Sequence, residues 1–191
     1  MIDKALNLLI KDINTYLGSL FKLSSSEAEK IVLTNIGKDN GNVAIPSDSL
    51  GLTLVNIEEE RVVKSQMTTK VTNGNSSHIN PEIKLNLYAM VCANFNDYKS
   101  GLAYLSGVVR FFQGKSVFTR DNTPGLDESI KKLIVELYSL SFEQQNHIWG
   151  SIGVKYLPSV LYKIRLVTIK EDLAKDEFPV IEAIGLEDNV I

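Results

Sequence analysis

The chain begins with a helical pattern of apolar positions. Apolar residues recur at three- and four-residue spacing through residues 2–21, while Lys4 and Lys11 lie away from that stripe. This spacing places the apolar side chains on one face of an α-helix. Because Asp3 and Asp12 accompany the lysines, the polar face lacks the basic character of a helix that lies on a membrane surface. We therefore expect a helix that packs on a core or on another subunit.

Several later segments alternate apolar and polar residues, a pattern typical of β-strands. The predicted strands cover residues 30–36, 51–57, 82–95, 131–140 and 160–169. Another extended piece is expected at residues 115–120. Residues 65–81 are rich in Ser, Thr, Asn and Gly, which indicates a long loop or a hairpin that turns at Asn73-Gly74. We expect residues 65–80 to be the least ordered internal segment.

A second helix is predicted after the strand at residues 82–95. Asp97 is placed to cap its N-terminus, and we expect the helix to run to about residue 112. Its buried stripe should consist of the apolar positions at helical spacing, which are Tyr98, Leu102, Leu105, Val109 and Phe112. This stripe should pack on the sheet.

The stretch of residues 141–169 joins a third helix to the last long strand. Ser141 and Gln144 have the spacing of a capping box, and Pro158 prevents the helix from continuing. Trp149, the only Trp of the chain, lies near the end of that helix, and Tyr162 lies in the strand. Aromatic residues bury a large area when they pack between a helix and a sheet. We therefore expect Trp149 and Tyr162 to anchor the core.

Together these elements predict the fold class α+β. Short connections and few crossovers favour a mixed, largely antiparallel sheet, with the N-terminal helix and two further helices packed on it. One domain should cover residues 1–170, because 191 residues suffice for a single sizeable core. Residues 171–191 are expected to form a charged tail in which 180–184 could add an edge strand.

Composition narrows the classes of protein. The net charge is -3 and no basic run stands out, which argues against a protein that binds nucleic acid by neutralising phosphates. Charged residues interrupt the apolar residues near the N-terminus, unlike those of a signal peptide. No apolar run is long enough to cross a bilayer. We therefore expect no membrane insertion and a protein that is made in the cytoplasm.

Little in the sequence indicates catalysis. Cys92, the single cysteine, lies in a predicted strand and is expected to be a structural thiol. His147 is one helical turn from Ser151, but no acid is placed to orient it. We expect no enzyme activity, no cofactor and no metal site. An enzyme that uses only the carboxylates of Glu58 or Glu60 stays open as an alternative.

A charged run, Glu58, Glu59, Glu60 and Arg61, follows the strand predicted at residues 51–57. Neighbours on an extended chain point to opposite faces, so at most Glu58 and Glu60 converge. No His, Asp or Cys lies close in sequence to complete a set of metal ligands. We interpret the run as a solvated strand end or as a contact with another subunit.

Four blocks of the sequence carry a family resemblance. They cover residues 2–17, 52–65, 81–119 and 133–169, and they include IEEE after a strand and the closing SFEQQNHIWGSIGVKYLPSVLY. In this order they resemble the tail-terminator, or cap, proteins of phage-tail-like contractile injection systems. The resemblance spans about 170 residues, and some relatives look longer at the C-terminus.

The resemblance implies a structural protein. Such caps form a six-membered ring on the last ring of the inner tube, engage the end of the contractile sheath and stop tube growth. It implies a homo-hexamer with the tube and sheath proteins as partners, assembled in the bacterial cytoplasm into the particle. Glu58, Glu59, Glu60 and Arg61 would then be candidate contacts with the tube or with a neighbouring subunit. The alternative is a monomeric or dimeric α+β domain that acts as an adaptor or binding module without catalysis.

Overall fold

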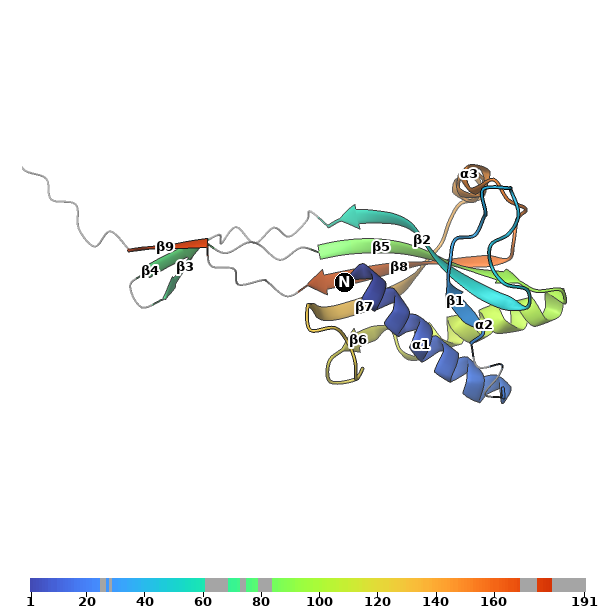
Figure 1. The fold of residues 1–191 in the computed structure, drawn as a ribbon, viewed down its shortest axis with the longest axis horizontal. Helices are drawn as coiled ribbons and strands as arrows, with labels where there is room; N and C mark the ends of the chain where they lie inside the picture. Colours follow the sequence, from blue (N-terminus) through green and yellow to red (C-terminus); the bar gives the residue numbers. More distant parts are fainter. Residues whose placement is uncertain are drawn as a thin grey trace, which may run out of the picture.

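The computed structural model describes residues 1–24, 27, 29–60, 69–72, 75–78, 84–168 and 175–179. Within this part of the chain, three helices accompany a six-stranded sheet and a smaller three-stranded sheet (Figure 1). The fold is therefore α+β, as the sequence predicts.

The described residues form three helices, and capping residues mark several of their ends. They are α1 (Ile2–Phe21), α2 (Tyr98–Gly114) and α3 (Phe142–Ile152). The bounds of α1 match the apolar pattern, and the helix ends at Lys22 in the left-handed conformation (φ 53°, ψ 46°). The Asp97 carboxylate caps α2 by accepting a hydrogen bond from the Ser100 backbone N–H.

The predicted capping box starts α3. The Ser141 hydroxyl accepts from the Gln144 backbone N–H, and the Gln144 side chain accepts from the Ser141 backbone N–H. Two N–H groups that lack helical partners are thereby satisfied. The helix ends at Gly153, whose φ of 71° suits a residue without Cβ.

The six-stranded sheet is mixed and largely antiparallel, as predicted. Its strand order is β1-β2-β5-β8-β7-β6, in which only β1 and β2 run parallel within the described sheet. Its strands are β1 (Ile31–Leu33), β2 (Ser49–Glu59), β5 (Lys84–Asn94), β6 (Val117–Thr119), β7 (Ile130–Tyr138) and β8 (Ser159–Thr168).

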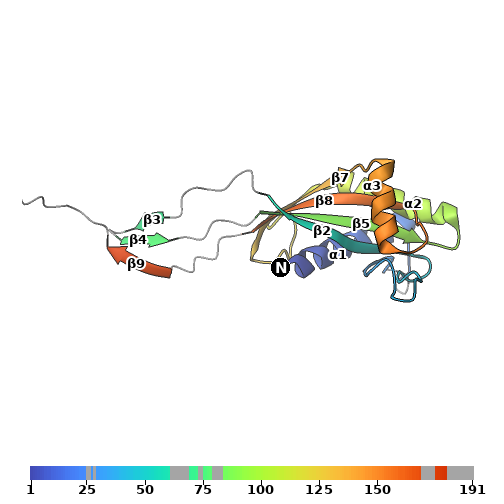
Figure 2. The ribbon, with the colours of Figure 1, turned by 90° about the horizontal axis from the view of Figure 1, so that it is seen from above.

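The strands of the smaller sheet are connected along the chain to three neighbouring strands of the larger sheet. Its strands are β3 (Thr69–Thr72), β4 (Asn75–His78) and β9 (Lys175–Pro179), in the order β3-β4-β9. β3 follows β2, β4 precedes β5 and β9 follows β8 along the chain. The neighbours β2, β5 and β8 therefore have their continuations as neighbours in the same order (Figures 1 and 2).

Part of the predicted organisation lies outside the described residues. The hairpin alternative for the polar segment is confirmed by the pairing of Thr72 with Asn75, but its turn at Asn73-Gly74 is not among the described residues. The edge strand expected at 180–184 also lies outside them. The boundary of the domain at residue 170 stays a prediction, as does the mobility of residues 65–80.

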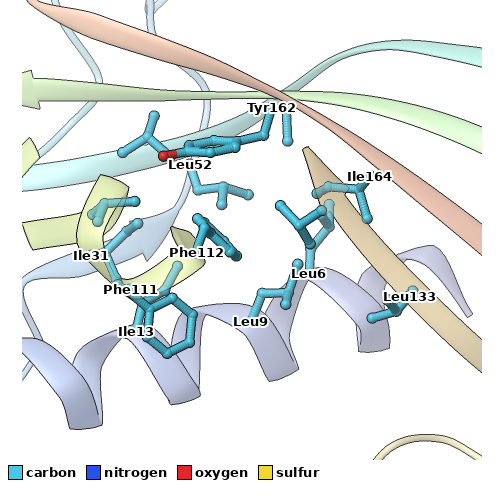
Figure 3. Packing of buried hydrophobic residues seen from close by; sticks show 14 of the residues in the cluster. Leu6, Leu9, Ile13, Ile31, Leu52, Phe111, Phe112, Leu133, Tyr162 and Ile164 are labelled. Atoms are coloured by element: carbon cyan, nitrogen blue, oxygen red, sulfur yellow. The ribbon is translucent and has the colours of Figure 1, made fainter. Parts of the chain in front are cut away.

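Helices α1 and α2 cover one face of the large sheet (Figure 1). Figure 3 shows the packing, in which Leu9 and Ile13 of α1 lie near Phe112 of α2, and Tyr162 and Ile164 point from the sheet toward them. All of these side chains are buried. This first face therefore holds the main core.

The predicted buried stripe of α2 is partly wrong. Leu105 and Phe112 are buried, but Tyr98 is 66% exposed and Leu102 is 42% exposed. The buried side instead passes through Gly101 and Gly107. A Cβ at Gly107 would lie 2.7 Å from the Leu17 side chain, so this glycine lets α1 and α2 approach closely. Because the sequence pattern counted only large apolar residues, it placed the buried face too far toward Tyr98.

Helix α3 and the segment of residues 36–45 cover part of the second face of the sheet (Figure 1). Trp149 is buried there with Met90, Cys92 and Leu161. Trp149 and Tyr162 are therefore both buried, at 7% and 2% exposure, but on opposite faces of the sheet.

Replacing Trp149 tests how much α3 depends on packing. The Trp149 Nε1 has no hydrogen-bond partner among the described residues, so the loss comes from packing, which includes the edge-on contact with the Tyr156 ring at a centroid distance of 5.1 Å. We expect Trp149→Ala to lower the free energy of unfolding by about 3–5 kcal/mol, as large-to-small core substitutions do. Phe142→Ala is the matched control, because Phe142 lies on the same helix and is 93% exposed. Urea denaturation that gave the two variants equal stability would contradict the packing described for Trp149.

The Cys92 thiol provides a test of the second face by pH. Burial raises the pKa of Cys92 to about 12 from its ordinary value of 9.0. In the unfolded chain the thiol ionises near pH 9, whereas in the folded chain it stays protonated, so its contribution to stability falls as pH rises from about 9 to about 12. Between pH 8 and 11, wild-type stability should therefore fall more steeply than that of Cys92→Ala. A constant difference between the two proteins would contradict this.

Candidate functional site

The second face of the sheet is open and charged beyond the cover of α3. The side chains of Glu58, Glu60, Glu136, Lys163 and Arg165 share this side, because Glu136 pairs with Lys163 and Glu60 contacts Arg165. We call these five residues the charged face. Their position follows from strand alternation, since Leu161 on the same side of β8 packs under α3.

Glu58 is held by a tyrosine of the neighbouring strand. The Tyr88 hydroxyl donates a hydrogen bond of 2.8 Å to the Glu58 Oε2. This bond to the carboxylate raises the pKa of Tyr88 to about 12. The Tyr88 ring meets the Tyr138 ring edge-on, with centroids 5.3 Å apart. Glu58 is thus an oriented carboxylate at the border between the charged face and an aromatic pair.

Arg165 links the charges of three strands. Its Nε lies 3.4 Å from the Glu60 Oε2, and its Nη2 lies 3.7 Å from the Glu136 Oε2. The Glu60 Oε2 and Arg165 Nε atoms are buried, and they form an ion pair but no hydrogen bond. Contacts of this kind between partly exposed groups stabilise a fold weakly. The exposed carboxylate of Glu136 is the more accessible end of this cluster, because its side chain is 52% exposed.

The charged run predicted from the sequence lies at the end of β2. Glu58 and Glu59 are exposed, and the Glu60 side chain is 23% exposed. Glu58 and Glu60 lie on the second face, whereas Glu59 pairs with Leu85, whose side chain packs on the core of the first face. Arg61 lies outside the described residues. A role of these four residues as an interface stays a prediction.

The site also contains residues that the sequence did not single out. Tyr88, Tyr138, Glu136 and Arg165 come from three strands that are distant along the chain. The alternation of residues 160–167 already sets Arg165 on the face opposite Tyr162 and hence away from the core. Its partners Glu60 and Glu136 depend on strand order and register, which periodicity does not determine.

A groove runs between α3 and the open part of the sheet. It has a volume of about 440 Å³, and its lining includes Glu58, Tyr88, Tyr138 and His147. His147 is exposed, and the hydroxyl of Ser151 on the same helix donates to the Ile148 carbonyl at 2.8 Å. The described residues therefore show Ser151 bonded to its own helix. Glu58, held by Tyr88, brings an oriented carboxylate to this groove.

Two other features, a metal-binding cluster and a membrane-spanning helix, are absent from the described residues. It holds no group of three or more His, Cys, Asp or Glu side chains that could bind a metal ion together. None of its helices is both long enough and apolar enough to cross a membrane.

Large apolar side chains are exposed where β7 ends and α3 begins. Leu137 is 58% exposed, Tyr138 is 37% exposed and Phe142 is 93% exposed. We call these three residues the apolar patch. The patch straddles the end of β7, because Leu137 pairs with Tyr162 and lies on the first-face side, whereas Tyr138 pairs with Leu161 and lies on the second-face side. Tyr138 connects the patch to Tyr88 and therefore to the charged face.

Two solved structures have a similar fold. A sheath/tube terminator of an extracellular contractile injection system, PVC, in the extended state, aligns with a TM-score of 0.52 and 13% identity over 94% of this chain. The anti-feeding prophage cap, a tube-terminating cap, aligns with a TM-score of 0.60 and 12% identity over 97% of this chain. The alignments cover 64% and 60% of those longer chains. At these identities they show a shared fold.

The sequence itself matches a family model over nearly its whole length. No curated protein matches the chain. The model of the Pvc16 N-terminal domain matches residues 4–183, a range that includes every described helix and strand from β1 to β9 and all but the start of α1. The chain therefore belongs to the Pvc16 N-terminal domain family.

Proposed function

We propose that this chain is a structural cap of a contractile injection particle. In this proposal it forms a six-membered ring on the last ring of the inner tube, stops tube growth and engages the end of the sheath. The observation that carries the proposal is the family match over residues 4–183. The fold shared with a sheath/tube terminator and with a tube-terminating cap supports it.

The physical requirement for such a cap is simple. A tube grows because each ring presents a surface on which the next ring assembles. A terminator must match that surface on one side and present no equivalent surface on the other. Identical head-to-tail contacts between subunits that close into a ring also prevent growth within the plane of the ring. A small domain meets this requirement if it has two complementary side surfaces for the ring and one further surface for the tube.

The charged face and the apolar patch are the surfaces that we assign to these contacts. The apolar patch supplies area that can be removed from water. Glu58 and Glu59, at the exposed end of β2, suit a rim contact, as does Arg61, which follows them in sequence. Charges at a rim set the orientation and rate of association more than its affinity. Glu60 adds an ion pair with Arg165 that a partner could rearrange.

Tube length tests the proposed function. We expect particles made without this protein to have tubes of excessive or uncontrolled length, because the terminal ring keeps its growing surface. Negative-stain microscopy of particles purified from cells with and without the gene measures this. The control restores the gene on a plasmid and should restore uniform length. Fully sheathed particles of normal length without the protein would contradict the cap and favour an adaptor.

Charge reversal at the end of β2 tests the assigned contact. The double variant Glu58→Lys and Glu59→Lys should fold, because both side chains are exposed. The acidic end of β2 would be steered toward a basic tube end. At low ionic strength we therefore expect the reversed variant to associate with tube ends about tenfold more slowly than the wild type. Added salt should reduce the difference, because it screens exposed charges.

The control for that variant is Glu29→Lys. Glu29 is exposed and precedes β1, whose register places it by the start of β2 and not by its end. Biolayer interferometry on immobilised tubes gives both association rates. Equal rates for Glu29→Lys and for the double variant would remove the end of β2 from the contact.

A further inference from the structure

The two outer strands of the large sheet have their edges occupied by side chains. In the order β1-β2-β5-β8-β7-β6, β1 and β6 are the edge strands. An edge strand ordinarily presents backbone N–H and C=O groups that can pair with a strand of another molecule. Each edge of this sheet instead meets the amide of one asparagine.

Asn14 of α1 occupies the edge of β1. The Leu50 N–H donates to the Lys30 carbonyl at 2.7 Å and the Thr34 N–H donates to the Leu52 carbonyl at 3.1 Å, so these alternate residues bond to β2. Ile31, between them, directs its backbone groups outward. Its N–H donates to the Asn14 Oδ1 at 2.9 Å, and its carbonyl accepts from the Asn14 Nδ2 at 2.9 Å. Asn14 thus bonds both outward groups of Ile31, and its Oδ1 also accepts from the Lys30 N–H at 2.9 Å.

Asn122 occupies the edge of β6 in a similar way. The Val135 N–H donates to the Ser116 carbonyl at 2.8 Å, which places Val117 and Thr119 with their backbone groups outward. The Thr119 N–H donates to the Asn122 Oδ1 at 2.9 Å, and the Val117 carbonyl accepts from the Asn122 Nδ2 at 2.9 Å. One amide therefore spans two outward groups of this strand.

An asparagine amide suits this position because it repeats the chemistry of a peptide group. It offers one carbonyl acceptor and an NH₂ donor, so it satisfies an edge N–H and an edge C=O together. Both edge strands are also only three residues long. A short edge with two of its outward groups already bonded leaves little for an incoming strand to bind.

We propose that Asn14 and Asn122 close the two edges of the large sheet against pairing with a strand of another molecule. The chain therefore makes its contacts with other proteins through its faces and through the smaller sheet, and not by extending the large sheet. This inference concerns the isolated chain and does not depend on the proposed function. A protein that ends an assembly gains from it, because a closed edge offers no template for further addition.

Opening both edges tests the proposal. The double variant Asn14→Ala and Asn122→Ala gains two pairing edges per molecule, so we expect it to form a concentration-dependent series of species larger than any in the wild type. Each single variant opens one edge and should form a shorter series. Sedimentation velocity at matched concentrations measures this, and circular dichroism confirms that each variant is folded. Asn7→Ala is the control, because Asn7 is exposed on the same helix and makes none of these bonds.

Cross-linking identifies the edge that pairs. With Leu33→Cys added to Asn14→Ala, the larger species should form a disulfide-linked dimer on oxidation, because Leu33 lies on β1 and is 41% exposed. Cys92 is fully buried and does not interfere. A folded double variant that sediments as the wild type does at every concentration would overturn the proposal.

Amide exchange in the wild type tests the same closure without a substitution. Hydrogen–deuterium exchange by NMR should show slow exchange at the Ile31 and Thr119 amides, which donate to Asn14 and Asn122. The Leu33 amide, which also points outward, should exchange much faster. Exchange at Ile31 and Thr119 as fast as at Leu33 would show that the edges are open and would overturn the proposal.

Discussion

The structure depends on the burial of its central strands on both faces. In β5, Leu87 and Val91 contribute to the core under α1 and α2, whereas Met90 and Cys92 contribute to the core under α3. A shift of register by one residue would exchange the two sets of side chains. Since both sets are apolar but face partners of different shape, close packing on each side fixes one register. Every cross-strand contact of the charged face follows from that register.

The long strands extend this register beyond the part of the sheet that the helices cover. β2, β5 and β8 extend past the helices toward the smaller sheet, as Figure 2 shows. Where the cover ends, charged residues take the alternate positions that would otherwise be core, and Glu60 meets Arg165. The same rigid sheet therefore supports a stable interior and an accessible surface. An interface built on strands in this way keeps its geometry when it binds, which lowers the cost of association.

Sequence patterns predicted local structure well and tertiary placement less well. The bounds of α1, the cap at Asp97 and the capping box at Ser141 depend on neighbouring residues, so the sequence contains them. The buried side of α2 depends on how closely α1 approaches Gly107, which no apolar pattern records. For the site, the exposed end of β2 was predictable, but the pairing of Arg165 needed the strand order β2-β5-β8-β7. The edge contacts of Asn14 and Asn122 were missed for the same reason.

The central claim is that this fold ends a tube. Its family, its two-faced sheet, its charged and apolar surfaces and its closed edges are each consistent with a domain that adds once and does not propagate. Cryo-electron microscopy of intact particles tests this most directly, with a reconstruction centred on the tube end. We predict one ring of this domain on the terminal tube ring and none along the shaft. Tube ends without this domain, or the domain repeated along the shaft, would contradict the account.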